Sequence, residues 1–306
     1  MAKGTKSRTP KRGKSKQMKK RNPTQLIYPI AAATGSSSEM IVQIDKLASN
    51  SNHRLYRQGR VYHAKVGYDA NTLGGAQAVD VYVLADTWFL SNAYKMAQRT
   101  FNLATKEERE SLAPENKARW YDFRIKDGVT GASRARVIHM APSGVGQALS
   151  QGEYDYSRVQ DQAGNMRDFT LGTAIPTSSY NILQEYGNTF NEQEDPTVPV
   201  TTSPYPDLPN MVKSTQEYLD LQEDGSLPPY DAAGVQDNQM WVKVGTISAG
   251  AYTSSTSSTL TTTNVFKAPL GMIRLRFSNG TFSDASDSLH VIASAGNYRG
   301  LKAERL

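Results

Sequence analysis

The amino-acid sequence predicts a mainly β fold, an antiparallel sandwich or barrel, with a helical insertion and a disordered basic N-terminal arm. Three observations lead to this prediction. Short alternating or β-branched runs recur along the chain, separated by Gly, Pro, Asn and Asp, which is typical of all-β sandwiches and barrels. Residues 86–104 have helical periodicity instead. Residues 1–22 hold ten Lys or Arg and no acid.

The N-terminal segment is too polar to fold alone. Residues 1–22 contain no aromatic residue and are rich in Lys, Gly and Ser, so they cannot bury enough apolar surface to offset their ordering entropy. Residues 31–38 are small or polar and are typical of a hinge. We therefore predict a disordered basic arm over residues 1–38 and one folded body over residues 39–306.

The positive charge is confined to this arm. The chain has 35 Lys or Arg and 29 Asp or Glu, and the first acid is Glu39. Without the ten cations of the arm, 25 cations (35 − 10) face 29 acids, so the rest of the chain sits near −4. This balance excludes a uniformly basic nucleic-acid-binding body.

The arm has the chemistry of a phosphate-binding segment. Lys and Arg release condensed counterions when they contact phosphates, which drives sequence-independent binding to nucleic acid. No aromatic residue precedes Tyr28, so the arm lacks groups that stack on bases. The alternatives are a solvated tail or a nuclear-import signal at residues 19–21, behind residues 11–12. The predicted phosphate contacts are Lys3, Lys6, Arg8, Lys11, Arg12, Lys14, Lys16, Lys19, Lys20 and Arg21.

Ten segments of the body have strand character, because apolar and polar residues alternate in them or β-branched residues dominate. They are residues 40–44, 60–66, 79–84, 120–125, 134–140, 169–173, 180–186, 240–247, 272–277 and 289–293.

A helical insertion is predicted over residues 86–113. Asp86 or Thr87 can cap its first helix, and Thr105 has capping-box spacing to Glu108 at the start of a second, which Pro114 bounds. Helices and strands do not alternate throughout, which excludes a parallel α/β fold. The face predicted to enter the core comprises Phe89, Ala93, Met96, Ala97, Thr100 and Ala104.

Residues 187–239 form a Pro-rich, acidic connection, which we expect to lie on a surface. The acids Glu192, Glu194 and Asp195 can offer oxygen ligands to a divalent cation. A solvated loop is the simpler interpretation, and the sequence predicts no other cofactor.

No catalytic constellation is apparent, and we predict that the chain is not an enzyme. It contains no cysteine. Gly13-Lys14-Ser15 resembles the end of a phosphate-binding loop but lacks the upstream glycine and strand. The four histidines are scattered without ligand spacing, and no apolar run approaches the roughly 18 residues that span a membrane.

Two parts of the chain resemble capsid proteins of small circular Rep-encoding single-stranded DNA viruses, within them the bacilladnavirus-like group. They are residues 56–125, which begin YRQGRVYHAKVGYDA, and residues 270–306, which end AGNYRGLKAERL. The resemblance implies a single eight-stranded jelly roll, an icosahedral shell of many copies and an arm that points inward to single-stranded DNA. It implies a virion location, with assembly in the host nucleus or cytoplasm, no catalytic residues and a host receptor of unknown identity. Residues 187–239 would then form an outer protrusion.

Two rival hypotheses remain open. A cellular nucleic-acid-binding protein, such as a chromatin or ribonucleoprotein component, would present a basic, aromatic face on a β-barrel body. A hydrolase or lectin-like sandwich with an unrelated tail would have a pocket with convergent polar groups.

Overall fold

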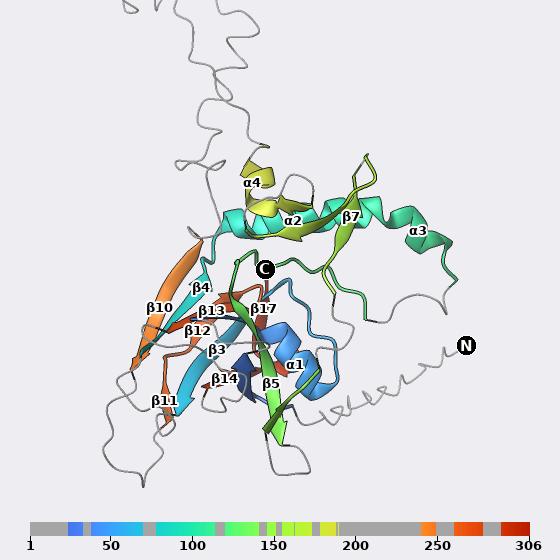
Figure 1. Ribbon diagram of the computed structural model, residues 1–306. Helices are drawn as coiled ribbons and strands as arrows, with labels where there is room; N and C mark the ends of the chain where they lie inside the picture. The colour runs from blue at the N-terminus through green and yellow to red at the C-terminus, as the bar shows by residue number, and fades with distance from the viewer. Residues whose placement is uncertain are drawn as a thin grey trace, which may run out of the picture.

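The structure, a computed structural model, describes residues 24–32, 38–69, 78–113, 120–140, 146–150, 155–161, 163–172, 178–187, 189, 240–248, 260–277 and 289–306. The ten arm cations and residues 190–239 lie outside these ranges. Within them the fold is mainly β, as predicted, with a curled sheet (Figure 1).

The twelve-stranded sheet contains two antiparallel runs of four longer strands each. One short parallel pairing, Met40 with Ser133 and Ile41 with Arg134, connects the runs. The first run, in spatial order, is β10 (Trp241–Ser248), β4 (Ala78–Leu84), β13 (Met272–Phe277) and β2 (Glu39–Gln43). The second run is β5 (Ser133–Met140), β1 (Ile27–Ala32), β14 (Leu289–Ala293) and β3 (Arg60–Asp69).

Shorter strands extend the second run. They are β6 (Gly146–Ala148) beside β5, and β11 (Leu260–Thr262), β12 (Phe266–Pro269) and β17 (Ala303–Arg305) beside β3. Strand β3 therefore organises this half of the molecule, because it pairs with four other strands.

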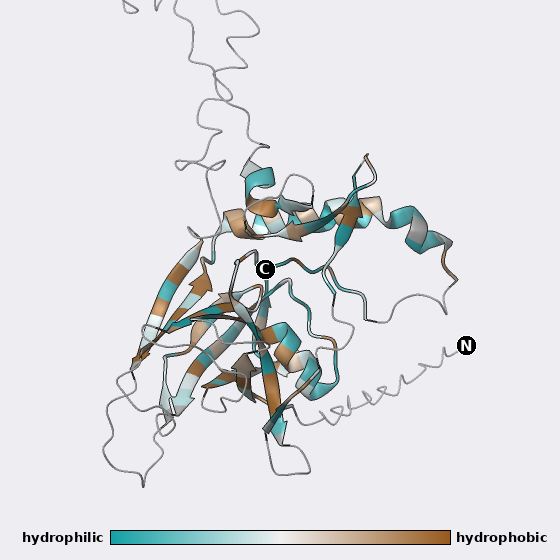
Figure 2. Cartoon of the chain, in the orientation of Figure 1, coloured by the Kyte–Doolittle hydropathy of each residue, from teal (hydrophilic) through white to brown (hydrophobic). Residues whose placement is uncertain are grey.

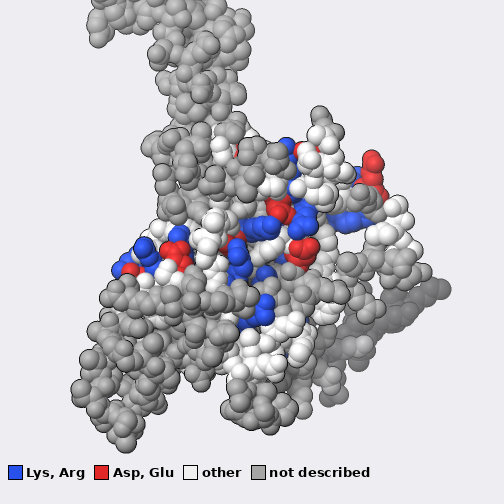
Figure 3. All heavy atoms as spheres, viewed as in Figure 1, with Lys and Arg blue, Asp and Glu red and all other residues white. Residues whose placement is uncertain are grey.

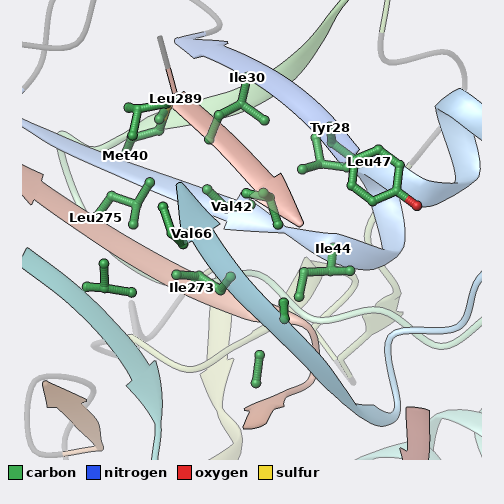
Figure 4. Close-up of a cluster of buried hydrophobic side chains, with 14 of the residues drawn as sticks. Tyr28, Ile30, Met40, Val42, Ile44, Leu47, Val66, Ile273, Leu275 and Leu289 are labelled. Carbon is green, nitrogen blue, oxygen red and sulfur yellow. The ribbon is translucent and has the colours of Figure 1, made fainter. Parts of the chain in front are cut away.

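The first hydrophobic core receives side chains from both runs. Figure 2 shows apolar residues (brown) and polar residues (teal) interspersed along the strands. In β4, buried and half-buried residues alternate. This period-two pattern directs one side of each strand inward. Figure 4 shows the convergence of Tyr28, Ile30, Met40, Val42, Val66, Ile273, Leu275 and Leu289, all at most 1% exposed.

A second core lies beneath a layer of helices and short strands (Figure 1). Ile41 faces it while its neighbours Met40 and Val42 face the first core, so β2 is buried on both sides. The covering layer comprises α2 (Trp88–Ala104), α3 (Lys106–Ser111), α4 (Ile182–Gly187), β7 (Arg158–Gln160), β8 (Met166–Thr170) and β9 (Ser179–Asn181).

The predicted arm over residues 1–38 is wrong for residues 27–32. These residues form β1, in which Tyr28 and Ile30 are fully buried. Strand β1 pairs with β14 and β5, which lie more than 100 residues away. A second difference is smaller. The predicted strand 40–44 ends one residue early, at Gln43, because α1 (Ile44–Asn52) begins at Ile44.

Two further predicted strands are wrong. Residues 182–187 form α4, so only Ser179–Asn181 of that region is a strand. Residues 120–125 are irregular because side chains satisfy their backbone: Gln58 Oε1 accepts from the Ile125 N–H at 2.7 Å, and Ser157 Oγ accepts from the Arg124 N–H at 3.0 Å.

The helical insertion is confirmed as α2 and α3, with Thr87 Oγ1 accepting from the Leu90 N–H at 3.3 Å. The capping box is wrong, since Thr105 Oγ1 donates to the Phe101 carbonyl instead. The predicted core face is partly wrong: Met96, Thr100 and Ala104 are exposed. The buried face is rotated by the packing of α2 on the second core and comprises Phe89, Leu90, Ala93, Tyr94, Ala97 and Phe101.

Candidate nucleic-acid interface

A small hairpin interrupts the C-terminal strand. Strands β14 and β17 both pair with β3, at Ala293 with Ala64 and at Ala303 with Tyr62. Between them, the His63 backbone carbonyl accepts from the Ser294 N–H at 2.8 Å, and the His63 backbone N–H donates to the Lys302 carbonyl at 3.1 Å. Residues 294–302 are therefore looped out opposite one residue of β3, as β15 (Ala295–Gly296) and β16 (Gly300–Leu301).

The hairpin ends in a tight turn centred on Arg299 and Gly300. Tyr298 and Leu301 exchange two backbone hydrogen bonds of 2.9 Å. Arg299 has φ 52° and Gly300 has φ 99°, and positive φ at both central residues is typical of type I′ turns. Because an arginine is disfavoured there, neighbouring contacts must hold it. The Arg299 carbonyl accepts from Tyr56 Oη at 2.9 Å and Thr24 Oγ1 at 3.3 Å, and its guanidinium donates to the Leu55 carbonyl.

This turn lies against the first residues that the structure describes, which follow the predicted arm. Asn52 Oδ1 accepts from the Gln25 N–H at 2.7 Å, and Tyr28 Oη donates to the Gln25 carbonyl at 2.6 Å. The Leu26 carbonyl accepts from the Ala293 N–H at 2.8 Å. Thr24 and Gln25, which directly follow the last arm residues, are thus fixed between α1, β14 and the hairpin tip.

Cations gather around the same turn. Arg54, Arg57 and Arg60 occupy every third position after α1, separated by the buried residues Leu55, Tyr56 and Gln58. The Arg60 guanidinium carbon lies 3.6 Å from the centre of the Tyr298 ring, and Tyr298 Oη accepts from the Arg57 N–H at 3.1 Å. We call this set the arm-exit surface: Arg54, Arg57, Arg60, Tyr298, Arg299 and Lys302.

The tyrosine at the centre of this surface is rigidly placed. Its ring makes edge contacts with Tyr56 and Tyr62 at centroid distances of 6.0 and 6.4 Å. Arg60 covers one face of the ring, and Arg299 lies 5.9 Å from its centre. Cation–π contacts of this kind hold guanidinium groups in place without neutralising their charge.

Many cations elsewhere on the body, though not all of them, pair with acids. In Figure 3, Lys and Arg are interleaved with Asp and Glu below the helical layer. Among the ion pairs of the body, Lys126 and Arg158 share Asp168, and Arg134 pairs with Asp127 at 3.1 Å. Within the ranges that the structure describes, by contrast, none of the five cations of the arm-exit surface forms an ion pair.

One buried acid lies beneath this surface. Asp122 Oδ2 accepts from the Gln58 N–H at 3.0 Å, and its side chain is only 4% exposed. Burial raises the pKa of this carboxyl, against the opposing effects of the Gln58 hydrogen bond and the charges of Arg124 and Arg57. Asp122 therefore positions the loop from inside and leaves the outer surface cationic.

The site residues predicted from sequence, the ten arm cations, lie outside the described residues. The arm-exit surface is absent from that prediction because the near −4 average of the body conceals a local patch. Two signals point to it in hindsight: the three-residue spacing of Arg54, Arg57 and Arg60, and the two cations in Tyr298-Arg299-Gly300-Leu301-Lys302.

The other candidate sites give no catalytic arrangement. His63 Nε2 lies 2.9 Å from Glu304 Oε1 and belongs to the pairing of β3 with β17. The acids at 192–195 lie outside the described residues, and among the described ones no group of three His, Asp or Glu can hold a metal ion.

A cavity of about 430 Å³ opens between α2, α4 and β7–β9. Its mostly apolar lining includes Ala93, Met96, Phe169 and Ile182. Glu185 is the single charged residue among the described residues that line it.

Comparisons with known proteins identify no relative of the chain. No family model, curated protein or solved structure matches the chain. Among the described helices, none is both long enough and apolar enough to span a membrane.

Proposed function

We propose that the chain is a viral capsid protein, which assembles in many copies into an icosahedral shell and packages nucleic acid. The resemblance of residues 56–125 and 270–306 to capsid proteins of single-stranded DNA viruses favours single-stranded DNA as the packaged genome. We further propose that the two four-stranded runs form a single eight-stranded jelly roll. Their face-to-face core and the short link between them support this architecture, because jelly rolls pack two such sheets together.

The fixed exit of the arm is the observation that carries the proposal. Ten cations precede a point that α1, β14 and the C-terminal hairpin hold in place. Each copy of a shell would thus direct its arm from the same position of a mildly acidic body. An arm with a defined origin and no base-stacking groups suits the neutralisation of phosphates of any sequence.

Removal of residues 1–22 tests this function. We expect the truncated chain to unfold at the same temperature as the full chain but to lose most of its packaged nucleic acid, measured by ultraviolet absorbance of purified particles. Electron microscopy should show uniform particles for the full chain. A matched control keeps the length of the arm and replaces its ten cations by Gln, and it should behave as the truncation does.

Two results would contradict the proposal. Truncated particles that retain nucleic acid at the full-chain level would exclude the role of the arm. A full chain that remains a monomer or small oligomer at every salt concentration would exclude the shell.

The arm-exit surface favours a second candidate, a cellular nucleic-acid-binding protein. Such a protein would bind through a basic, aromatic face of its body, and Arg54, Arg57, Arg60 and Tyr298 form such a face. Under this hypothesis, binding would survive removal of the arm and particles would be absent.

A further inference from the structure

We propose that the arm-exit surface is itself a phosphate-binding site, which receives the nucleic-acid backbone where the arm enters the body. The inference rests on the proposed function in one respect, since the arm brings nucleic acid to this place. It adds a second, pre-formed binding element on the folded body.

The accessibility of the cations supports this site. Arg57, Arg299 and Lys302 are exposed, and Arg54 and Arg60 are half-buried. Guanidinium groups bind phosphates through several N–H donors in a fixed planar arrangement. Five cations without an ion-pair partner among the described residues leave this capacity available for a ligand.

Pre-organisation distinguishes these cations from those of the arm. Arg60 is stacked on Tyr298, and Arg57 is tied to Tyr298 through its backbone. Arg299 occupies a left-handed position that suits Gly or Asn better, which indicates that another requirement keeps an arginine there. Cations held in place lose less side-chain entropy on binding than those on a flexible segment.

The structure also indicates what the site recognises. Arg60 already covers one face of Tyr298, so the ring supports a cation and is not open on that side to a base. We therefore expect contacts to phosphates and no preference among base sequences. The ligand class is the sugar–phosphate backbone of nucleic acid.

The test uses the full chain with three exposed or half-exposed cations changed together: Arg54→Gln, Arg57→Gln and Lys302→Gln. A matched control changes three cations of the helical layer, Lys95→Gln, Arg99→Gln and Lys106→Gln, which are exposed and do not belong to the arm-exit surface. Both variants lose the same charge. Equal thermal unfolding midpoints would show that all three proteins are folded.

Affinity is measured by fluorescence anisotropy as a function of salt, with an oligothymidylate of about 20 nucleotides, longer than a typical single-strand site. Each phosphate contact on a single strand contributes about 0.7 to the magnitude of the slope of log affinity against log salt. The arm-exit variant removes three cations, so this magnitude should fall by about 2. The control variant should leave the slope unchanged. An equal loss of slope in both variants, or no loss in the first, would overturn the proposal.

The same assay separates this site from the arm. The chain without residues 1–22 is measured beside the variants. If truncation lowers the slope and the arm-exit changes do not, the proposed role of the arm stands and the body site is wrong. If the arm-exit changes lower the slope and truncation does not, the body site stands and the role of the arm is wrong.

Discussion

At the scale of the residue, Gly300 shows how closely the hairpin approaches Thr24, the first described residue. Its φ is 99°, and a Cβ atom added there would lie 2.2 Å from Thr24 Oγ1. The left-handed backbone alone costs a residue with a side chain roughly 1–2 kcal/mol. We predict that Gly300→Ala lowers the free energy of unfolding by more than this amount, measured by urea denaturation, because the steric clash adds to the backbone strain.

Gly131 provides the matched control at this scale. Its φ is 77°, and no heavy atom lies within 4 Å of the position that a Cβ would take. Gly131→Ala should thus cost only the backbone strain. Equal losses in the two variants would mean that Thr24 does not contact the hairpin tip in solution.

At the scale of the element, β1 belongs to the folded body although it lies within the arm predicted over residues 1–38. Ile30 is fully buried between β14 and β5, whereas Ile27 on the same strand is 53% exposed. We predict that Ile30→Ala lowers the free energy of unfolding by about 2–5 kcal/mol, as cavity-forming changes in cores do. Ile27→Ala should change it by less than about 0.5 kcal/mol. Similar small effects at both positions would mean that β1 is not docked.

Local alternation of apolar and polar residues predicts some strands of the fold but not others. Residues 79–84 and 272–277 are predictable because alternation within a few residues already defines a half-buried strand. Strand β1 is not, because Pro29 and the small residues Ala31 and Ala32 give no such pattern. Its strand character comes from pairing with residues 289–292 and 135–137.

The candidate site depends still more on distant contacts. The cationic arm remains a prediction from composition, outside the described residues. The arm-exit surface combines residues 54–60 with 298–302, and the register of β14 and β17 on β3 brings these segments together. No local signal encodes that register, so the sequence supplies the residue types of the surface but not their assembly.

At the scale of the whole molecule, charge and hydrophobic packing perform separate tasks. The body is held by two apolar cores, whereas under the proposed function nucleic acid would be bound by cations on the arm and around its exit. At about 1 M salt the Debye length falls to about 3 Å, which weakens phosphate contacts but leaves apolar burial intact. We predict that this salt concentration releases nucleic acid from the full chain while the near-ultraviolet circular dichroism of the body stays unchanged.

Return to low salt distinguishes release from damage. The nucleic acid should rebind to the level of the untreated sample, because the body keeps its tertiary packing. The chain without residues 1–22 should show a smaller salt-dependent step, since its body is near −4 and keeps only the arm-exit surface as a proposed phosphate-binding site. Retention of nucleic acid at high salt, or loss of the tertiary signal together with release, would show that binding and folding share the same contacts.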